Sequence, residues 1–246
     1  MTALVSLFAR AYHQKNKDIK IFDDLLSTKL ITEKEYEMFG LNMSQGISFF
    51  NPTFKGSEEE ALKWIVDHQL SPSVLVRSAF CKEAIEDKRQ RCKDVDIENI
   101  QFLSIDLSQE NWINTLLQGD YQEDQLSISS MLGLSYYLTK DEFKKMLKQL
   151  SKYLLKGSRL VFDYPSIQES KETKINEMLA KEADESMKAK YSFAELKEIL
   201  NQCHLTIIQH ENHQTVTEKY ISNYNAYYKD DPIKAPEGVC YCVVEK

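Results

Sequence analysis

The clearest hydrophobic pattern in the chain runs from Gln125 to Pro165 and predicts a strand, a helix and a second strand. Residues 126–131 alternate polar and apolar side chains, and residues 158–162 form a short apolar run closed by Asp-Tyr-Pro. Both segments have the length and the punctuation of strands. Between them, Thr139 precedes two acidic residues, and apolar residues then recur at helical spacing as far as Gly157. This spacing predicts a capped helix with one apolar face.

Two strands joined by a helix within about 40 residues are typical of a right-handed parallel crossover. In sheets built from such units, ligands bind beyond the carboxyl ends of the strands. The residues from Met131 to Tyr137 follow the first strand, and Asp163 and Tyr164 follow the second. These two places are therefore the first candidates for a functional site.

The rest of the chain predicts further helices and strands around this unit. Residues 1–38 are expected to be helical, with one apolar stripe near residues 4–11 and another near residues 21–30. The polar helix expected at residues 167–187 could form a lid, and the last strand is expected to close an edge hairpin. The other expected helices span residues 61–68 after a capping box at Ser57 and Glu60, 72–85, 108–117 and 192–200; the other expected strands span 97–107, 205–210 and 239–244.

Composition narrows the class of protein. No apolar run approaches the roughly 20 residues that span a bilayer, and the first residues lack the pattern of a signal peptide. The formal net charge of −7 disfavours broad binding to nucleic acid or to an anionic membrane. The five cysteines are never spaced as Cys-X-X-Cys, which suits reduced thiols. We therefore expect a cytoplasmic protein that binds a small molecule or a protein partner, without nucleic acid, membrane or metal.

Several segments carry a resemblance when they are taken in order along the chain: IFDDLLSTKLI, SVLVRSAF, IQFLSIDL, SMLGLSYYLTKDEF, GSRLVFDYP, MKAKYSFAELKEIL and the C-terminal strand. Together they resemble the leucine carboxyl methyltransferase family of class I S-adenosylmethionine-dependent methyltransferases, specifically its bacterial small-molecule branch. The resemblance implies an α/β fold with a Rossmann-like class I methyltransferase sheet. It implies a helical N-terminal cap over residues 1–72 and a methyltransferase-like domain over residues 73–246. It also implies an O-methyltransferase that acts on a small-molecule or carboxylate acceptor.

The resemblance also implies which residues bind the cofactor, S-adenosylmethionine. Arg77 is expected to face the methionine carboxylate, because a guanidinium fork binds a carboxylate bidentately. Asp106 is expected to accept a hydrogen bond from the adenine amino group, and Leu107 to cover the ring. Leu132 completes the expected set, although many members of the family have a glutamate at its position. For Arg77 and Asp106, the simpler roles of a surface ion pair and a strand end remain open.

On the acceptor side, the resemblance places Tyr137 beside the reacting methyl group and gives Asp163 and Tyr164 a substrate-binding role. A packed core tyrosine and a plain turn are the simpler alternatives for these residues. Methyl transfer from a sulfonium depends mainly on holding the acceptor in line with the methyl group in a site closed to water. A carboxylate acceptor is already nucleophilic at neutral pH, whereas a hydroxyl acceptor needs a base that the sequence does not identify.

One part of the family pattern is not found in this chain. Family members have a strand, a glycine-rich GxGxDT-like turn, a helix and a second strand ending in an acid that holds the ribose. The seven glycines of this chain include no Gly-X-Gly pair. The stretch between Ile85 and Ile100 is too short for a β-α-β unit of roughly 30 residues. We therefore expect the first two strands to be missing, with the shortening near residues 83–87.

Two hypotheses follow from this departure. The first is an active S-adenosylmethionine-dependent O-methyltransferase. The second is a degenerate, non-catalytic homologue that serves as a binding or regulatory module, because the glycine turn and the ribose acid supply most directional contacts to adenosine. A shortened sheet also has new edges, and a homodimer is the expected consequence of such edges.

Overall fold

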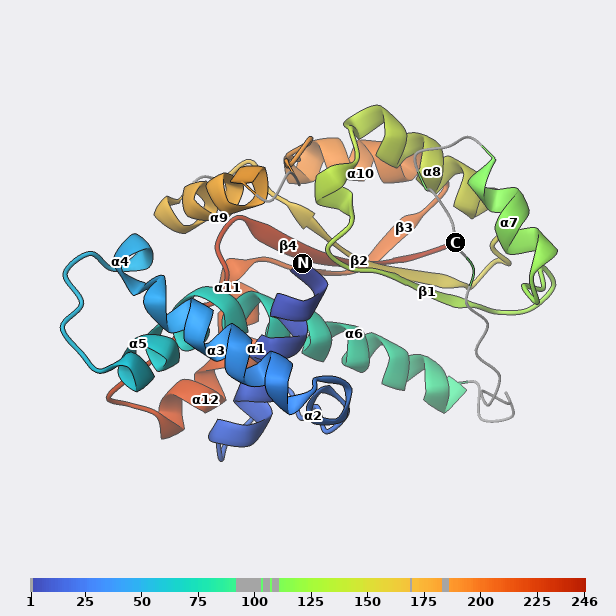
Figure 1. Ribbon diagram of the computed structural model, residues 1–246. Helices are drawn as coiled ribbons and strands as arrows, with labels where there is room; N and C mark the ends of the chain where they lie inside the picture. Colours follow the sequence, from blue (N-terminus) through green and yellow to red (C-terminus); the bar gives the residue numbers. More distant parts are fainter. Residues whose placement is uncertain (1, 92–102, 104–106, 108–110, 169, 183–185) are drawn as a thin grey trace. The chain divides into compact units, whose positions relative to one another are not determined.

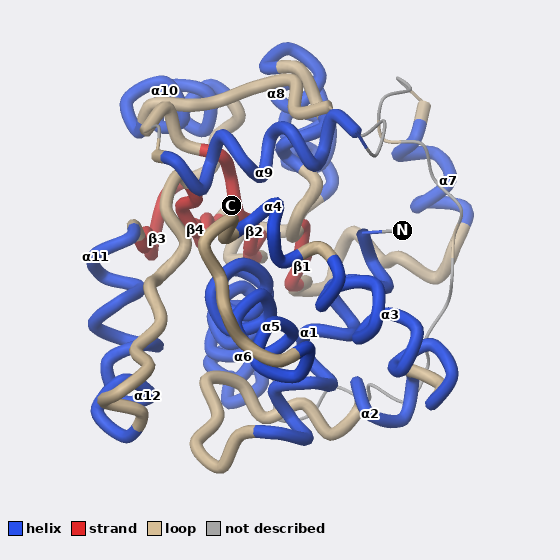
Figure 2. The backbone as a smooth tube through the Cα atoms, turned by 60° about the vertical axis from the view of Figure 1, so that its left-hand side comes forward, coloured by secondary structure: helices blue, strands red, loops and turns tan. Residues whose placement is uncertain are grey.

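The structure is a computed structural model that describes residues 2–91, 103, 107, 111–168, 170–182 and 186–246. It divides into two compact units. The first unit contains Met1–Ala79 and His213–Pro236, and the second contains Phe80–Asn212 and Glu237–Lys246. All the described strands, which are red in Figure 2, belong to the second unit. The predicted α/β class is confirmed, and the predicted domain boundary between residues 72 and 73 stays a prediction.

The second unit is built on a four-stranded sheet with the order β1-β2-β4-β3. β1 pairs with β2 in parallel, which confirms the parallel pairing that the sequence predicts. β4 is antiparallel to both of its neighbours, so β1, β2 and β3 all run in the same direction. The carboxyl ends of these three strands therefore meet at one end of the sheet. The strands are β1 (Ile128–Met131), β2 (Arg159–Pro165), β3 (Thr206–Glu211) and β4 (Val239–Glu245).

Two helices cover one face of this sheet and lie side by side, α8 (Lys140–Tyr153) and α10 (Phe193–Gln202) (Figures 1 and 2). Each begins with the predicted cap. The Thr139 hydroxyl accepts a hydrogen bond from the Glu142 backbone, and the Glu142 carboxylate accepts one from the Thr139 backbone. Ser192 and Glu195 repeat this reciprocal arrangement, which satisfies two otherwise unpaired amides at each helix start. The unit also contains α7 (Trp112–Gln118), the 3-10 turn η2 (Ser135–Tyr137) and α9 (Lys171–Glu182).

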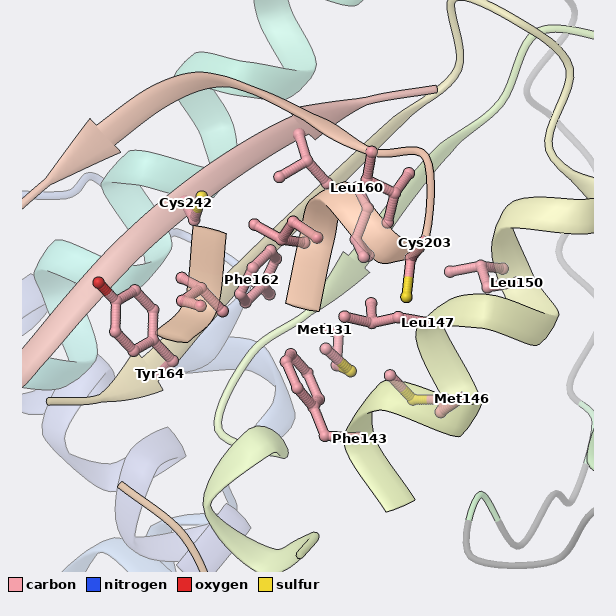
Figure 3. Packing of buried hydrophobic residues seen from close by; sticks show 14 of the residues in the cluster. Met131, Phe143, Met146, Leu147, Leu150, Leu160, Phe162, Tyr164, Cys203 and Cys242 are labelled. Carbon is pink, nitrogen blue, oxygen red and sulfur yellow. The ribbon is translucent and has the colours of Figure 1, made fainter. Parts of the chain in front are cut away.

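The main hydrophobic core lies between the sheet and these two helices (Figure 3). Phe143 and Leu147 of α8 are fully buried, as the helical spacing predicts, and they pack towards Phe162 of β2. The rings of Phe143 and Phe162 have centroids 5.8 Å apart. Burying a side chain of this size contributes about 1.5–3 kcal/mol. The core therefore fixes β2 against α8 and holds the carboxyl end of β2 in place.

The first unit is helical. Its core gathers around Phe8, which is fully buried and stacks obliquely on Tyr36 with ring centroids 5.1 Å apart. The predicted capping box at Ser57 and Glu60 is confirmed at the start of α5. The helices are α1 (Thr2–Asn16), α2 (Ser27–Leu30), α3 (Glu33–Gln45), α4 (Ile47–Phe50), α5 (Glu58–Ile65), the π-helix η1 (Val66–Leu70), α6 (Ser71–Arg91, which continues into the second unit), α11 (His213–Val216), the π-helix η3 (Thr217–Ile221) and α12 (Ser222–Tyr227).

The predicted helix over residues 1–38 is wrong in its middle, because residues 17–26 contain no helix. Side chains bind the backbone amides there and replace helical hydrogen bonds. The His13 ring accepts a hydrogen bond from the Ile21 amide over 3.1 Å, and the Gln14 side-chain carbonyl accepts one from the Asp24 amide over 3.0 Å. As a consequence, the second predicted stripe is not a buried helix face, and Leu25 is 65% exposed.

Two strand predictions also need correction. The sequence pattern predicts that the second strand ends at Phe162. In the structure β2 continues through Pro165, because β4 pairs with it along its whole length, and the last pair is Pro165 with Val239. The last strand was expected at an edge, but β4 lies between β2 and β3, and the outer strands of the described sheet are β1 and β3. The strand predicted at residues 97–107 falls almost entirely outside the described residues. Within the described part of the chain, no helix is long and apolar enough to cross a membrane.

Candidate functional site

The candidate site lies at the carboxyl end of the parallel strands β1 and β2. β1 ends at Met131, which pairs with Phe162, so β2 continues for three residues beyond the end of its neighbour. After β1 the chain turns through residues 132–138, which contain η2. This loop and the overhanging end of β2 lie next to each other, as the hydrogen bonds below show. They are the two places that the sequence marked out for chemistry.

Asp163 joins the loop after β1 to the end of β2. Its Oδ1 accepts a hydrogen bond from the Gly133 amide over 2.6 Å, and its Oδ2 accepts one from the Tyr136 hydroxyl over 3.3 Å. The Ser135 hydroxyl donates to the Asp163 backbone carbonyl over 2.6 Å. The Asp163 side chain is fully buried, and both carboxylate oxygens have partners inside the protein. Buried carboxylates are stable only with such partners. The predicted substrate contact of Asp163 stays a prediction.

Gly133 gives the loop its direction. Its φ is +70°, in the left-handed region that residues with a Cβ atom rarely adopt. In this conformation the Gly133 amide donates a hydrogen bond to the Asp163 carboxylate, which lies near the end of β2. The same loop reaches a further segment, because the Tyr136 carbonyl accepts a hydrogen bond from the Lys188 amide over 2.7 Å. A glycine at this point therefore decides where the whole loop runs.

Leu132 and Tyr137 belong to this loop and are both half-buried. The Tyr137 ring lies beside the Tyr136 ring, with centroids 6.4 Å apart. The structure thus brings two of the predicted site residues, Leu132 and Tyr137, onto the segment that Asp163 holds. Their predicted roles, contact with the cofactor and with the reacting methyl group, stay predictions.

Tyr164 points to the opposite face of the sheet from Asp163, because successive residues of a strand alternate between faces. It belongs to the core in Figure 3 and is 1% exposed. Its hydroxyl lies 2.8 Å from Nε2 of His210 on β3. Burial raises the pKa of Tyr164, with smaller contributions from Cys240 and Cys242. Burial also lowers the pKa of His210, although Glu211 opposes the shift. Both groups are therefore neutral at pH 7.

The other three predicted site residues, Arg77, Asp106 and Leu107, belong to other segments of the chain. Arg77 lies on α6, is half-buried and belongs to the first unit. Leu107 is half-buried and packs against the main core cluster. Asp106 lies outside the described residues. The predicted contacts of these three residues with the cofactor stay predictions.

The sequence marked residues 131–137 as a candidate site but did not predict the hydrogen bonds of Gly133, Ser135 and Tyr136, and it did not predict His210 as a partner. A glycine two residues after the strand was a usable signal for the turn. The bond between Tyr164 and His210 was not readable, because it joins residues 46 positions apart through the strand order. Among the described residues, no group of three or more histidine, cysteine, aspartate or glutamate side chains is placed to hold a metal ion.

A sequence model of the family described as leucine carboxyl methyltransferase matches this chain twice, over residues 3–95 and over residues 85–151. A protein of Bacillus subtilis (strain 168), described as "Putative S-adenosyl-L-methionine-dependent methyltransferase YktD", is 25% identical to it. That alignment covers 98% of this chain and 96% of the relative. It is 297 positions long, which is 51 more than the 246 residues of the chain.

Two solved structures have a distant likeness to this chain. A DUF574 family protein from Streptomyces avermitilis has 11% sequence identity and a TM-score of 0.48, with 98% of this chain and 97% of that chain covered. The magnesium protoporphyrin IX methyltransferase of Synechocystis, solved with bound SAH, has 8% identity and a TM-score of 0.37, with 100% and 95% covered. Both likenesses are too distant to carry a functional argument.

Proposed function

Because the chain belongs to the leucine carboxyl methyltransferase family, a family of S-adenosylmethionine-dependent methyltransferases, we propose that it transfers a methyl group from S-adenosylmethionine to an oxygen atom of a small acceptor. The observation that carries this proposal is the family match over residues 3–151, which is more than half of the chain. The relative from Bacillus subtilis supports it over nearly the whole length of both chains.

The site itself supports a carboxylate as the acceptor. Asp163 and His210 are titratable groups at the carboxyl ends of β2 and β3, and each already has a hydrogen-bond partner within the protein. A hydroxyl acceptor needs a base to remove its proton, and neither of these groups is placed to serve. A carboxylate is deprotonated at neutral pH and needs no base. We therefore propose a small carboxylic acid as the substrate and a methyl ester as the product.

One element of the family's cofactor site is not found in the sequence of this chain. No two glycines anywhere in the sequence are separated by a single residue, so the turn that brings backbone amides to the cofactor is not encoded. Among the described strands, β1 pairs only with β2. The described sheet thus ends where the nucleotide-binding strands of a doubly wound sheet would begin. The loop after β1, with Leu132 and Tyr137, supplies one wall of a site at most.

A second function is favoured by the alignment with the relative. At least 51 alignment positions have no residue of this chain, and the family match breaks into two pieces that overlap at residues 85–95. A deletion near residues 83–87 accounts for both facts, because the family has a nucleotide-binding β-α-β unit of roughly 30 or more residues at this point. On this reading the chain is a binding or regulatory module without catalysis.

One experiment separates the two functions. The purified chain is titrated with S-adenosylhomocysteine by calorimetry, and its thermal unfolding is followed with and without the ligand. Micromolar binding raises the melting temperature, since a ligand at 100 times its Kd stabilises the folded state by about 2.7 kcal/mol. That result supports the methyltransferase. No binding to a chain that unfolds cooperatively contradicts the methyltransferase and supports the module.

A chimera tests whether the shortening removed the cofactor site. In it, the extra segment of the Bacillus subtilis relative is inserted between Ile85 and Glu86. If the shortening removed the cofactor site, the chimera binds S-adenosylhomocysteine and the natural chain does not. If the natural chain binds, Arg77→Met should abolish binding, and Arg10→Met is the matched control. Arg10 pairs with Asp24 over 3.1 Å in the same unit, so its loss should leave binding unchanged.

If binding is found, the acceptor is tested by mass spectrometry. Small carboxylic acids are incubated with the chain and S-adenosylmethionine, each beside the matching primary alcohol. The proposal expects methyl esters from the acids and no ethers from the alcohols. Methylation of the alcohols alone would contradict the carboxylate assignment.

A further inference from the structure

We infer that Asp163 is a positioning residue, which acts on a bound ligand through the loop 132–138 and not by contact of its own carboxylate. The inference rests on the proposed function only for the identity of that ligand. Its geometric part concerns the loop alone, and it can be tested in the chain without any ligand.

The first argument is that the Asp163 carboxylate lies in the interior and binds the loop. The side chain is fully buried, Oδ1 accepts from Gly133 and Oδ2 accepts from Tyr136. Each carboxylate oxygen can accept more than one hydrogen bond, so burial, and not saturation, keeps a ligand away from it. A ligand could contact this carboxylate only if the residues that bury it moved aside.

The second argument is that the loop needs this carboxylate. Gly133 has a left-handed backbone, so its amide does not continue a strand ladder and Asp163 is the acceptor that it has. The 2.6 Å distance between the Gly133 nitrogen and Asp163 Oδ1 is short for a hydrogen bond from a backbone amide. Ser135 adds a bond to the Asp163 carbonyl. Three successive points of the loop are therefore fixed to one residue of β2.

The third argument is that the connection extends beyond the loop. Tyr136 bonds to Asp163 through its hydroxyl and to Lys188 through its carbonyl. Two residues further, Lys190 pairs with Glu177 of α9 over 2.6 Å. A single buried carboxylate thus holds the loop with Leu132 and Tyr137 and, through Tyr136, the segment that leads from α9. Any ligand at this end of the sheet meets walls whose positions depend on Asp163.

The test compares four forms of the chain: wild type, Asp163→Ala, Asp163→Asn and Glu245→Gln. Asparagine keeps the shape and can still accept from Gly133 and donate to the Tyr136 hydroxyl. Glu245 is the matched control, because it pairs with Arg159 over 3.1 Å at the opposite end of β2. Amide hydrogen exchange is measured by NMR at Gly133 and at Val161 and Val243, which pair within the sheet.

The expected result is local. In Asp163→Ala, exchange at Gly133 should accelerate by at least tenfold relative to exchange at Val161 and Val243. Asp163→Asn should restore most of the protection, and Glu245→Gln should leave the ratio unchanged. A ratio that stays constant in Asp163→Ala would show that Asp163 only stabilises the fold, and the inference would be overturned. If Asp163→Ala does not fold, Tyr136→Phe and Ser135→Ala are measured in its place with the same criterion at Gly133.

A second measurement separates this inference from the proposed function. If the wild type binds S-adenosylhomocysteine, Asp163→Ala should weaken that binding by at least tenfold, and Asp163→Asn should weaken it less. Unchanged affinity in a variant with a loosened loop would overturn the positioning role for this ligand. If the wild type binds none, the proposed function fails, and the exchange experiment still decides whether Asp163 holds the loop.

Discussion

His13 should make the stability of this protein depend on mildly acidic pH. The side chain is 1% exposed, and its Nε2 accepts a hydrogen bond from the Ile21 amide, which requires the neutral ring. Burial, with smaller contributions from Lys17 and Lys20, lowers the pKa of His13 from 6.5 to about 4. In the unfolded chain the ordinary value returns, so the unfolded state binds more protons between these two values.

The sign and the size of the effect follow from this difference. The contribution of His13 is fully present above pH 6.5 and is lost as the pH falls towards 4, because protonation then favours unfolding. A difference of one pKa unit corresponds to about 1.4 kcal/mol, so the loss across the window is about 3 kcal/mol. This is a large fraction of the stability of a typical domain.

The assay is urea unfolding of the wild type and of His13→Gln at a series of pH values from 4 to 7. Glutamine offers an oxygen acceptor to the Ile21 amide but does not titrate. Carboxylates also titrate in this range, and they contribute equally to both proteins, so the difference between the two free energies of unfolding isolates His13. That difference should change by about 3 kcal/mol across the range, in favour of the variant at low pH. A difference independent of pH would refute the reasoning.

Three further changes have expected outcomes that urea unfolding can measure. Phe143→Ala should cost about 3–5 kcal/mol, since the ring is fully buried against Phe162, and a cost below 1 kcal/mol would contradict this core. Lys17→Met should cost about 1–3 kcal/mol, because Asp67, 3% exposed, loses its 2.5 Å partner and keeps Lys63 at 3.2 Å; adding Asp67→Leu should recover part of the loss, and no recovery would count against the pair. Thr139→Ala should cost about 1 kcal/mol through the cap of α8, and no change would contradict its role.

Local signals in the sequence were enough to predict many of the helices and strands of the second unit. The capping residues Thr139 and Ser192 and the helical spacing after them placed α8 and α10, because caps and periodicity are properties of neighbouring residues. The alternation before Met131 and the apolar run before Asp163 placed β1 and most of β2. The order of these elements was also enough to predict the parallel crossover.

Local signals failed where hydrogen bonds outside the regular helix or strand pattern decide the backbone. Residues 17–26 have an apolar pattern that fits a helix, but the side chains of His13 and Gln14 accept hydrogen bonds from backbone amides there. The end of β2 was placed too early, because its last residues are strand only through their pairing with β4. In both cases the deciding partner is not visible in the local pattern.

The sequence by itself determined the family, the central strand-helix-strand unit and the lack of a Gly-X-Gly turn, since each of these depends on residue identity and order. The tertiary structure alone decided what the candidate residues touch. Asp163 and Tyr164 are adjacent in sequence, but strand alternation sends one to the loop after β1 and the other to His210 on β3. A residue type can suggest a chemistry, whereas its partners depend on which strands the fold brings together.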